Sequence, residues 1–81
     1  MRGYKVNLAA SVYKDLRDVP RQMLGRLMGV IDSLKQDPVP MNAIAVSPAE
    51  KIFRIRVGDC RIVYSVDHEG KTVTIQAVQH R

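Results

Sequence analysis

The sequence lacks the features of secreted, membrane-spanning and metal-cluster proteins. Cys60 is the one cysteine among 81 residues, which excludes an internal disulfide and leaves no cysteine cluster for a metal. No apolar run approaches the roughly 20 residues of a membrane-spanning helix. The N-terminal stretch MRGYKVNL has no apolar segment typical of a signal peptide. We therefore expect a cytoplasmic protein that needs no metal or other cofactor.

The chain is also too short for more than one ordinary domain, so we expect a single domain over residues 1–81. A domain of this size buries roughly 60–65% of its unfolded surface, which is enough for one modest core. Apolar residues make up 46% of the sequence, which argues against wholesale disorder.

Acidic residues are scarce beside basic ones. Thirteen Lys and Arg against eight Asp and Glu give a formal net charge of +5, and most of these cations are arginine. Arginine presents a planar fork of donors that suits phosphate. The charge thus indicates a nucleic acid, an acidic protein partner, or both, and a merely solvated basic surface is the alternative.

The first half of the chain is predicted to form a strand and two helices. Alternation in YKVNL (4–8) predicts a strand. Residues 10–18 predict a short helix with Ser11 as its N-cap. Pro20 suits the first turn of a second helix, whose apolar residues follow the helical period: Met23, Leu24, Leu27, Met28, Ile31 and Leu34.

The second half is predicted to form strands. Pro38 and Pro40 are expected to end the helix, and residues 38–50 to form a long loop. Alternating segments then predict strands near 51–57, 60–66 and 72–79. The order β-α-α-β-β-β does not alternate, so we expect an α+β fold in which a helical hairpin covers one face of an antiparallel sheet.

The first hairpin determines which side chains share a face. With Gly58 and Asp59 as a two-residue turn, Arg56 lies opposite Arg61 and Arg54 lies opposite Val63. Directly opposed side chains share a face, so the three arginines project to one side and the apolar residues to the other.

The apolar pattern of the second hairpin predicts the register in which its two strands pair. Three pairs keep one face apolar: Val66 with Val73, Tyr64 with Ile75, and Ile62 with Ala77. This register pairs Arg61 with Val78 and Asp59 with His80. It therefore predicts His80 on the arginine side, diagonal to Arg61, with polar Ser65, Thr74 and Gln76 around them.

Opposed like charges destabilise a strand pair by up to about 1 kcal/mol, and no acidic residue is interleaved here. The cluster of Arg54, Arg56 and Arg61 therefore favours an anion site over a solvated face.

Several stretches together resemble the RelE/ParE superfamily of bacterial toxins. They are YKVNLAASVYKDLRDVP, DPVP, FRIRVGDCRIVYSVD and the terminal VQHR, and RIRVGDCRIVY followed by HR is most similar to the RelE branch. The resemblance implies the toxin of a type II toxin–antitoxin system, a ribosome-dependent endoribonuclease that cleaves mRNA. The implied partners are an acidic antitoxin, through which alone the toxin oligomerises, and mRNA on the ribosome. The implied site residues are Arg54, Arg56, Arg61, His80 and Arg81.

The chain departs from the family pattern in two places. Many members have an aromatic residue where Cys60 stands, and we expect Cys60 to be a small core residue. Many members also carry a functional tyrosine beyond the HR pair, whereas no residue follows Arg81 here. Tyr64 is predicted to face the core and Tyr4 to lie on an edge strand, so neither is an obvious replacement. We expect either a truncated sequence or a variant with altered or lost activity.

The family reaction needs a base for a ribose 2′-hydroxyl and cations for the charge on phosphorus. Deprotonating an arginine at pH 7 costs roughly 7–9 kcal/mol, so the arginines suit charge stabilisation. Histidine exchanges protons near neutrality, which makes His80 the candidate base, and a solvated strand end is its alternative role. His68 is expected to be exposed in a turn. Two other functions stay open: a ParE-like inhibitor of DNA gyrase, and a non-catalytic RNA-binding module.

Overall fold

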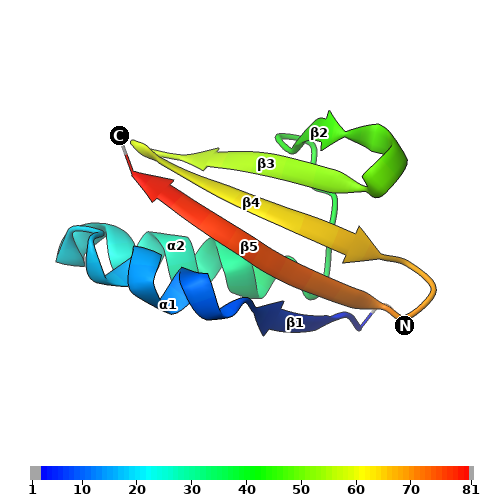
Figure 1. Cartoon of the computed structure of the whole chain (residues 1–81), viewed down its shortest axis with the longest axis horizontal. Coiled ribbons are helices and arrows are strands. Elements are labelled where there is room, and N and C mark those ends of the chain that lie inside the picture. Colours follow the sequence, from blue (N-terminus) through cyan, green and yellow to red (C-terminus); the bar gives the residue numbers. More distant parts are fainter. Residues whose placement is uncertain (1–2, 81) are drawn as a thin grey trace.

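The computed structural model describes residues 3–80 and forms a five-stranded sheet with both helices on one face (Figure 1). The elements in chain order are β1 (Lys5–Leu8), α1 (Ala10–Arg17), α2 (Arg21–Ser33), β2 (Ile44–Ser47), a short 3-10 helix η1 (Pro48–Glu50), β3 (Ile52–Val57), β4 (Cys60–Asp67) and β5 (Thr72–His80). The strand order across the sheet is β1-β5-β4-β3-β2. The predicted α+β class and the covering helical pair are confirmed.

The sheet is mixed, whereas an entirely antiparallel sheet was predicted. β1 runs parallel to β5, with Lys5 opposite Thr72 and Leu8 opposite Ile75. The other three strand pairs are antiparallel. The two consecutive hairpins force antiparallel pairing because their turns are short. No turn joins β1 to β5, so the sequence pattern carried no information on their relative direction.

The predicted loop over 38–50 is wrong in its second half. The edge strand β2 pairs with β3 there, with Ile44 opposite Arg54 and Ala45 opposite Phe53. Proline bounds this four-residue strand on its C-terminal side, because Pro48 begins η1. Such a short edge strand shows little alternation, since all but its last residue are exposed.

The start of α1 also differs from its prediction. The N-cap residue is Ala9, which has no capping side chain, and Ser11 lies inside the helix. The hydroxyl of Ser11 donates to the carbonyl oxygen of Gln76 in β5 at 3.3 Å. Packing of Val12 against the core, at 0% exposure, therefore anchors this helix in place of a side-chain cap.

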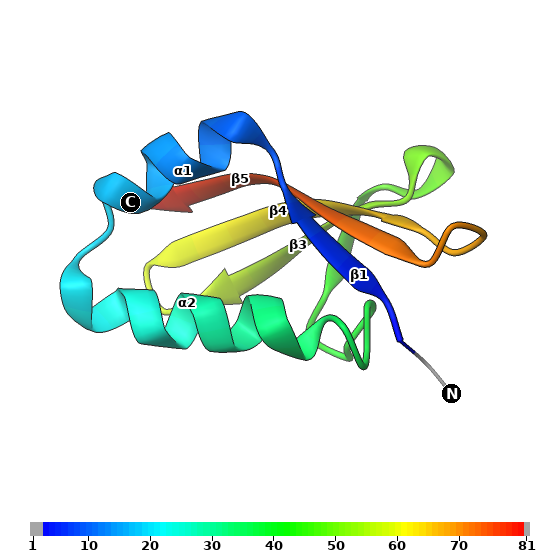
Figure 2. The same ribbon diagram turned by 90° about the horizontal axis from the view of Figure 1, so that it is seen from below.

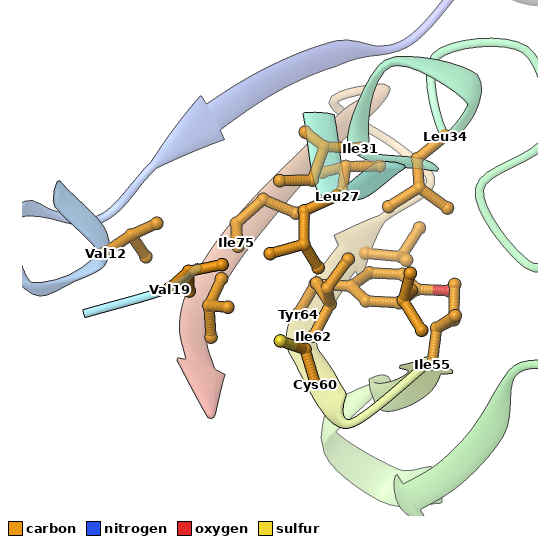
Figure 3. Close-up of a cluster of buried hydrophobic side chains, with 14 residues drawn as sticks. Val12, Val19, Leu27, Ile31, Leu34, Ile55, Cys60, Ile62, Tyr64 and Ile75 are labelled. Atoms are coloured by element: carbon orange, nitrogen blue, oxygen red, sulfur yellow. The ribbon is translucent and has the colours of Figure 1, made fainter. Parts of the chain in front are cut away.

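The core lies between the helical pair and the sheet (Figures 2 and 3). α2 contributes Leu27 and Ile31, and Leu34 follows directly after it. The strands contribute alternate residues, which are Ile55, Val57, Cys60, Ile62, Tyr64, Val66, Val73, Ile75 and Val78. α2 ends at Ser33, ahead of the prolines, and Pro38 accepts a hydrogen bond from the Tyr64 hydroxyl at 2.8 Å. The helices are therefore fixed on one face, which leaves the other face of the sheet bare.

Within residues 3–80, no helix has the length and apolar character needed to cross a membrane.

Candidate functional site on the bare face of the sheet

Three arginines from two adjacent strands share the bare face of the sheet, which we call the arginine face. Arg56 lies opposite Arg61 and Arg54 lies opposite Val63, so the predicted register of the first hairpin is confirmed. Gly58 in the turn has a φ of 60°, which suits glycine. A Cβ on Gly58 would also lie 2.8 Å from Cε of Met23. A larger residue there would therefore strain the turn that aligns the arginines.

The arginines are accessible and have no acidic partner within the described residues 3–80. Arg56 and Arg61 are exposed, and Arg54 is half-buried. Among residues 3–80 the one ion pair joins Lys35 to Asp32, at 2.9 Å. Arg56 Nε donates to the carbonyl oxygen of Gly58 at 3.2 Å, which holds its guanidinium toward the turn. The positive charge of the arginine face is thus available to an external anion.

A β-bulge overturns part of the predicted register of the second hairpin. Tyr64 pairs with Ile75 as predicted, but Val63 pairs with Ala77, so Gln76 is an extra residue on β5. From the bulge onward each pair is shifted by one residue. Ile62 lies opposite Val78 instead of Ala77, Arg61 opposite Gln79 instead of Val78, and Cys60 opposite His80.

The bulge buries a larger side chain than the regular register would. Val78 is 4% exposed on the core face, where the predicted pairing would place Ala77. Two additional carbon atoms are thereby removed from water, worth roughly 1.5 kcal/mol. This gain offsets the loss of regular pairing between β4 and β5 at the bulge. The alternation in the sequence did not reveal the bulge, because Ala77 is also apolar.

The prediction that His80 lies on the arginine face is wrong. Its register places it opposite Cys60 and not opposite Asp59, so the strand directs it to the core side, where it is exposed at the strand end. A hollow of about 70 Å³ is lined by His80 together with Asp59, Arg61 and Gln79. The structure thus brings His80 and Arg61 to one depression, whereas Arg81 lies outside the described residues.

Gln79 is the site residue that sequence reasoning missed. It lies directly opposite Arg61 on the arginine face and lines the same hollow. Its amide offers both a donor and an acceptor beside the guanidinium. Gln76, predicted in the polar platform, instead forms the bulge, while Ser65 and Thr74 are paired with each other as predicted.

The other candidate side chains lie away from the hollow. His68 is exposed in the turn after β4, and its Nδ1 is 2.9 Å from the hydroxyl of Tyr4, at the opposite end of the sheet. Cys60 is fully buried, and this burial, followed by the charge of Asp59, raises the pKa of its thiol. It is therefore a core residue and not an activated nucleophile. Burial and then the charge of Asp37 raise the pKa of Tyr64 to about 12.

The arrangement suits stabilisation of a phosphate by cations, with one imidazole at its border. Fixed guanidinium groups can stabilise negative charge that develops on phosphate oxygens. Over the described part of the chain, no group of three or more His, Cys, Asp or Glu side chains could hold a metal ion.

Comparisons with known proteins agree on one family. The family model described as the ParE toxin of type II toxin–antitoxin systems, parDE, matches residues 6–81. The protein named toxin RelE1 of Methanocaldococcus jannaschii is 26% identical over 81 aligned residues, covering 96% of this chain and 90% of the relative. The archaeal RelE–RelB complex from Pyrococcus horikoshii OT3 contains a chain with a TM-score of 0.84 and 28% identity, covering 100% of this chain and 97% of that one. The toxin–antitoxin complex RelBE2 from Mycobacterium tuberculosis gives a TM-score of 0.83 and 27% identity, covering 100% and 94%.

Proposed function

This chain belongs to the ParE toxin family of type II toxin–antitoxin systems, and we propose that it is a ribosome-dependent endoribonuclease that cleaves mRNA and inhibits translation. The proposal depends chiefly on the cluster of Arg54, Arg56 and Arg61, which share one exposed face without an acidic partner in residues 3–80. The RelE toxins in the similar solved complexes favour the nuclease branch.

The proposed reaction is an attack of a ribose 2′-oxygen on the adjacent phosphorus. The new 2′-O–P bond forms as the bond from phosphorus to the 5′-oxygen of the next nucleotide breaks. His80 takes the proton from the 2′-hydroxyl, and a water molecule from the solvent supplies the proton that the departing 5′-oxygen takes up. Arg61 lines the same hollow as His80. Together with Arg54 and Arg56 on the neighbouring strand, it stabilises the charge on the phosphate oxygens.

The proposed partners follow from the same charge. An acidic antitoxin is attracted to a chain with a net charge of +5, and the similar solved structures are complexes with RelB-type antitoxins. We propose that the second partner, mRNA on the ribosome, binds to the arginine face. The toxin is proposed to oligomerise only through its antitoxin.

The test is cleavage of mRNA held on a stalled ribosome, with free mRNA as the control substrate. We expect cleavage only on the ribosome, and loss of cleavage in the triple variant Arg54→Ala, Arg56→Ala, Arg61→Ala. Arg17→Ala, an exposed arginine on α1 away from the arginine face, is the matched control and should remain active. Equal cleavage by the triple variant and the wild type would exclude the arginine face as the active site.

A second candidate function is inhibition of DNA gyrase without nuclease activity, and the description of the matching family as ParE favours it. A gyrase supercoiling assay on the same preparation distinguishes the two. Inhibited supercoiling with intact mRNA would replace the nuclease proposal, whereas cleaved mRNA with normal supercoiling would support it. Either toxin should arrest growth when expressed without an antitoxin.

A further inference from the structure

The outer edge of β5 has two different neighbours along its length. β1 pairs with residues 72–75 and covers only the first half of the strand. Beyond Ile75 the neighbour is α1, which runs alongside the second half of β5 (Figure 2). The backbone of this second half therefore finds its partners on helix side chains instead of on another strand.

Two side chains of α1 hydrogen-bond to β5 on either side of Ala77. Ser11 Oγ donates to the carbonyl oxygen of Gln76 at 3.3 Å. The backbone N–H of Val78 donates to Oδ2 of Asp15 at 3.0 Å. Ser11 and Asp15 are four residues apart, so they lie on the same face of the helix. The Asp15 contact is charge-assisted and is the stronger kind of hydrogen bond.

These contacts lie at the bulge, and the bulge decides which side chains meet Arg61. Gln76 is the extra residue, and every later pair on β5 is shifted by one. Without the shift, Val78 would lie opposite Arg61 and His80 opposite Asp59. With it, Gln79 lies opposite Arg61 and His80 opposite Cys60. Bulges are one means by which strands re-aim side chains beside functional sites.

We propose that Asp15, assisted by Ser11, is a positioning residue that fixes the bulged register of β5 and so places Gln79 opposite Arg61. Asp15 accepts a hydrogen bond from Val78 only when Gln76 is the extra residue and Val78 faces the core. The helix thus selects between two registers that are both compatible with the apolar pattern. The role of Asp15 in setting the register is independent of the proposed function. Its effect on cleavage depends on the proposed nuclease function.

The register is measurable by NMR on the full chain. Val57 and Cys60 flank a two-residue turn, so the backbone groups of Cys60 face β3 and its pairing with β5 is the close, non-hydrogen-bonded type. We expect a strong Hα–Hα cross-peak between Cys60 and His80 in the wild type. A cross-peak between Cys60 and Gln79 in its place would show the regular register and overturn the proposal.

Two variants of Asp15 separate positioning from general stability. Asp15→Ala should weaken the Cys60–His80 cross-peak and accelerate exchange of the Val78 amide at least tenfold. Asp15→Asn keeps an oxygen acceptor and should retain both signatures. Asp18→Ala removes an equal charge three residues later, at the C-cap of the helix, and should change neither. An Asp15→Ala spectrum identical to that of Asp18→Ala would overturn the proposal, as would Asp15→Asn behaving like Asp15→Ala.

The same proteins then enter the ribosome-dependent cleavage assay, well below their melting temperatures. Asp15→Ala should lower kcat about tenfold to a hundredfold with little change in KM, because displacement by about 1 Å misaligns reacting groups. Asp15→Asn should restore kcat. If Asp15→Ala fails to fold, Ser11→Ala replaces it and should weaken the same cross-peak. If the wild type cleaves nothing, the nuclease proposal fails, while the spectra still decide whether Asp15 sets the register.

Discussion

Arg61→Ala should stabilise the fold and, if the nuclease proposal holds, abolish most of the activity. Arg61 lies opposite Arg56 in the first hairpin, and Arg54 is its diagonal neighbour. Val57 and Cys60 flank the two-residue turn, so the Arg56–Arg61 pair is the non-hydrogen-bonded type, in which side chains approach more closely. The native hairpin thus carries repulsion that alanine at position 61 would remove.

The size of the stabilisation follows from Coulomb's law. Two unit charges about 8 Å apart in water repel by roughly 0.5 kcal/mol. Adding the diagonal charge of Arg54 brings the sum to at most about 1 kcal/mol, which matches measured effects of opposed like charges. For a domain of this size, 1 kcal/mol corresponds to roughly 4–8 °C in Tm. Because these side chains are largely solvated, 1 M salt should erase most of the gain.

The activity should move in the opposite direction. Loss of one preorganised cation at the phosphate should reduce ribosome-dependent cleavage by roughly 10²–10³-fold. Both quantities should be measured on one preparation, by thermal unfolding at low and high salt and by cleavage of ribosome-bound mRNA. Stability and activity of opposite sign are typical of a functional cluster.

Arg17→Ala is the matched control. It removes the same charge from the last turn of α1, where a cation interacts favourably with the helix dipole. It should therefore lose a few tenths of a kcal/mol and keep full activity. If Arg61→Ala retains the wild-type cleavage rate, Arg61 is not at the phosphate. If Arg61→Ala instead unfolds, the guanidinium is structural and the repulsion argument is refuted.

Three further predictions concern the base, the core and the partner. His80→Ala should lower cleavage by roughly 10²–10⁴-fold, whereas His68→Ala, at the far end of the sheet, should not; equal rates for both variants would exclude His80 as the base. Tyr64 has its pKa raised to about 12 in the fold, so the wild type should lose on the order of 2 kcal/mol of stability as the pH rises from 10 to 12, because the unfolded tyrosine ionises first. Tyr64→Phe should remove that slope, as seen in the difference between denaturant titrations of the two proteins, while the exposed Tyr13→Phe should leave it unchanged. Association with an acidic antitoxin should slow markedly between 50 and 500 mM salt in stopped-flow measurements, and an association rate independent of salt would contradict electrostatic steering.

Local patterns in the sequence determined most of the architecture. The helical period from Met23 to Leu34 and the alternation in the last three strands predicted the covering helix and the adjacent strands. The two-residue turn at Gly58 and Asp59 set the register that places Arg56 opposite Arg61. These features follow from nearest neighbours in the chain, so short-range physical rules are sufficient for them.

Tertiary structure decided what depends on contacts distant in sequence. The parallel pairing of β1 with β5 joins the two ends of the chain, and β2 exists as a strand because β3 offers it an edge. The bulge at Gln76 depends on Ser11 and Asp15, more than sixty residues earlier. Ala77 and Val78 are both apolar, so alternation could not choose between the two registers. The helix packed beside β5 makes that choice, and with it the neighbours of Arg61.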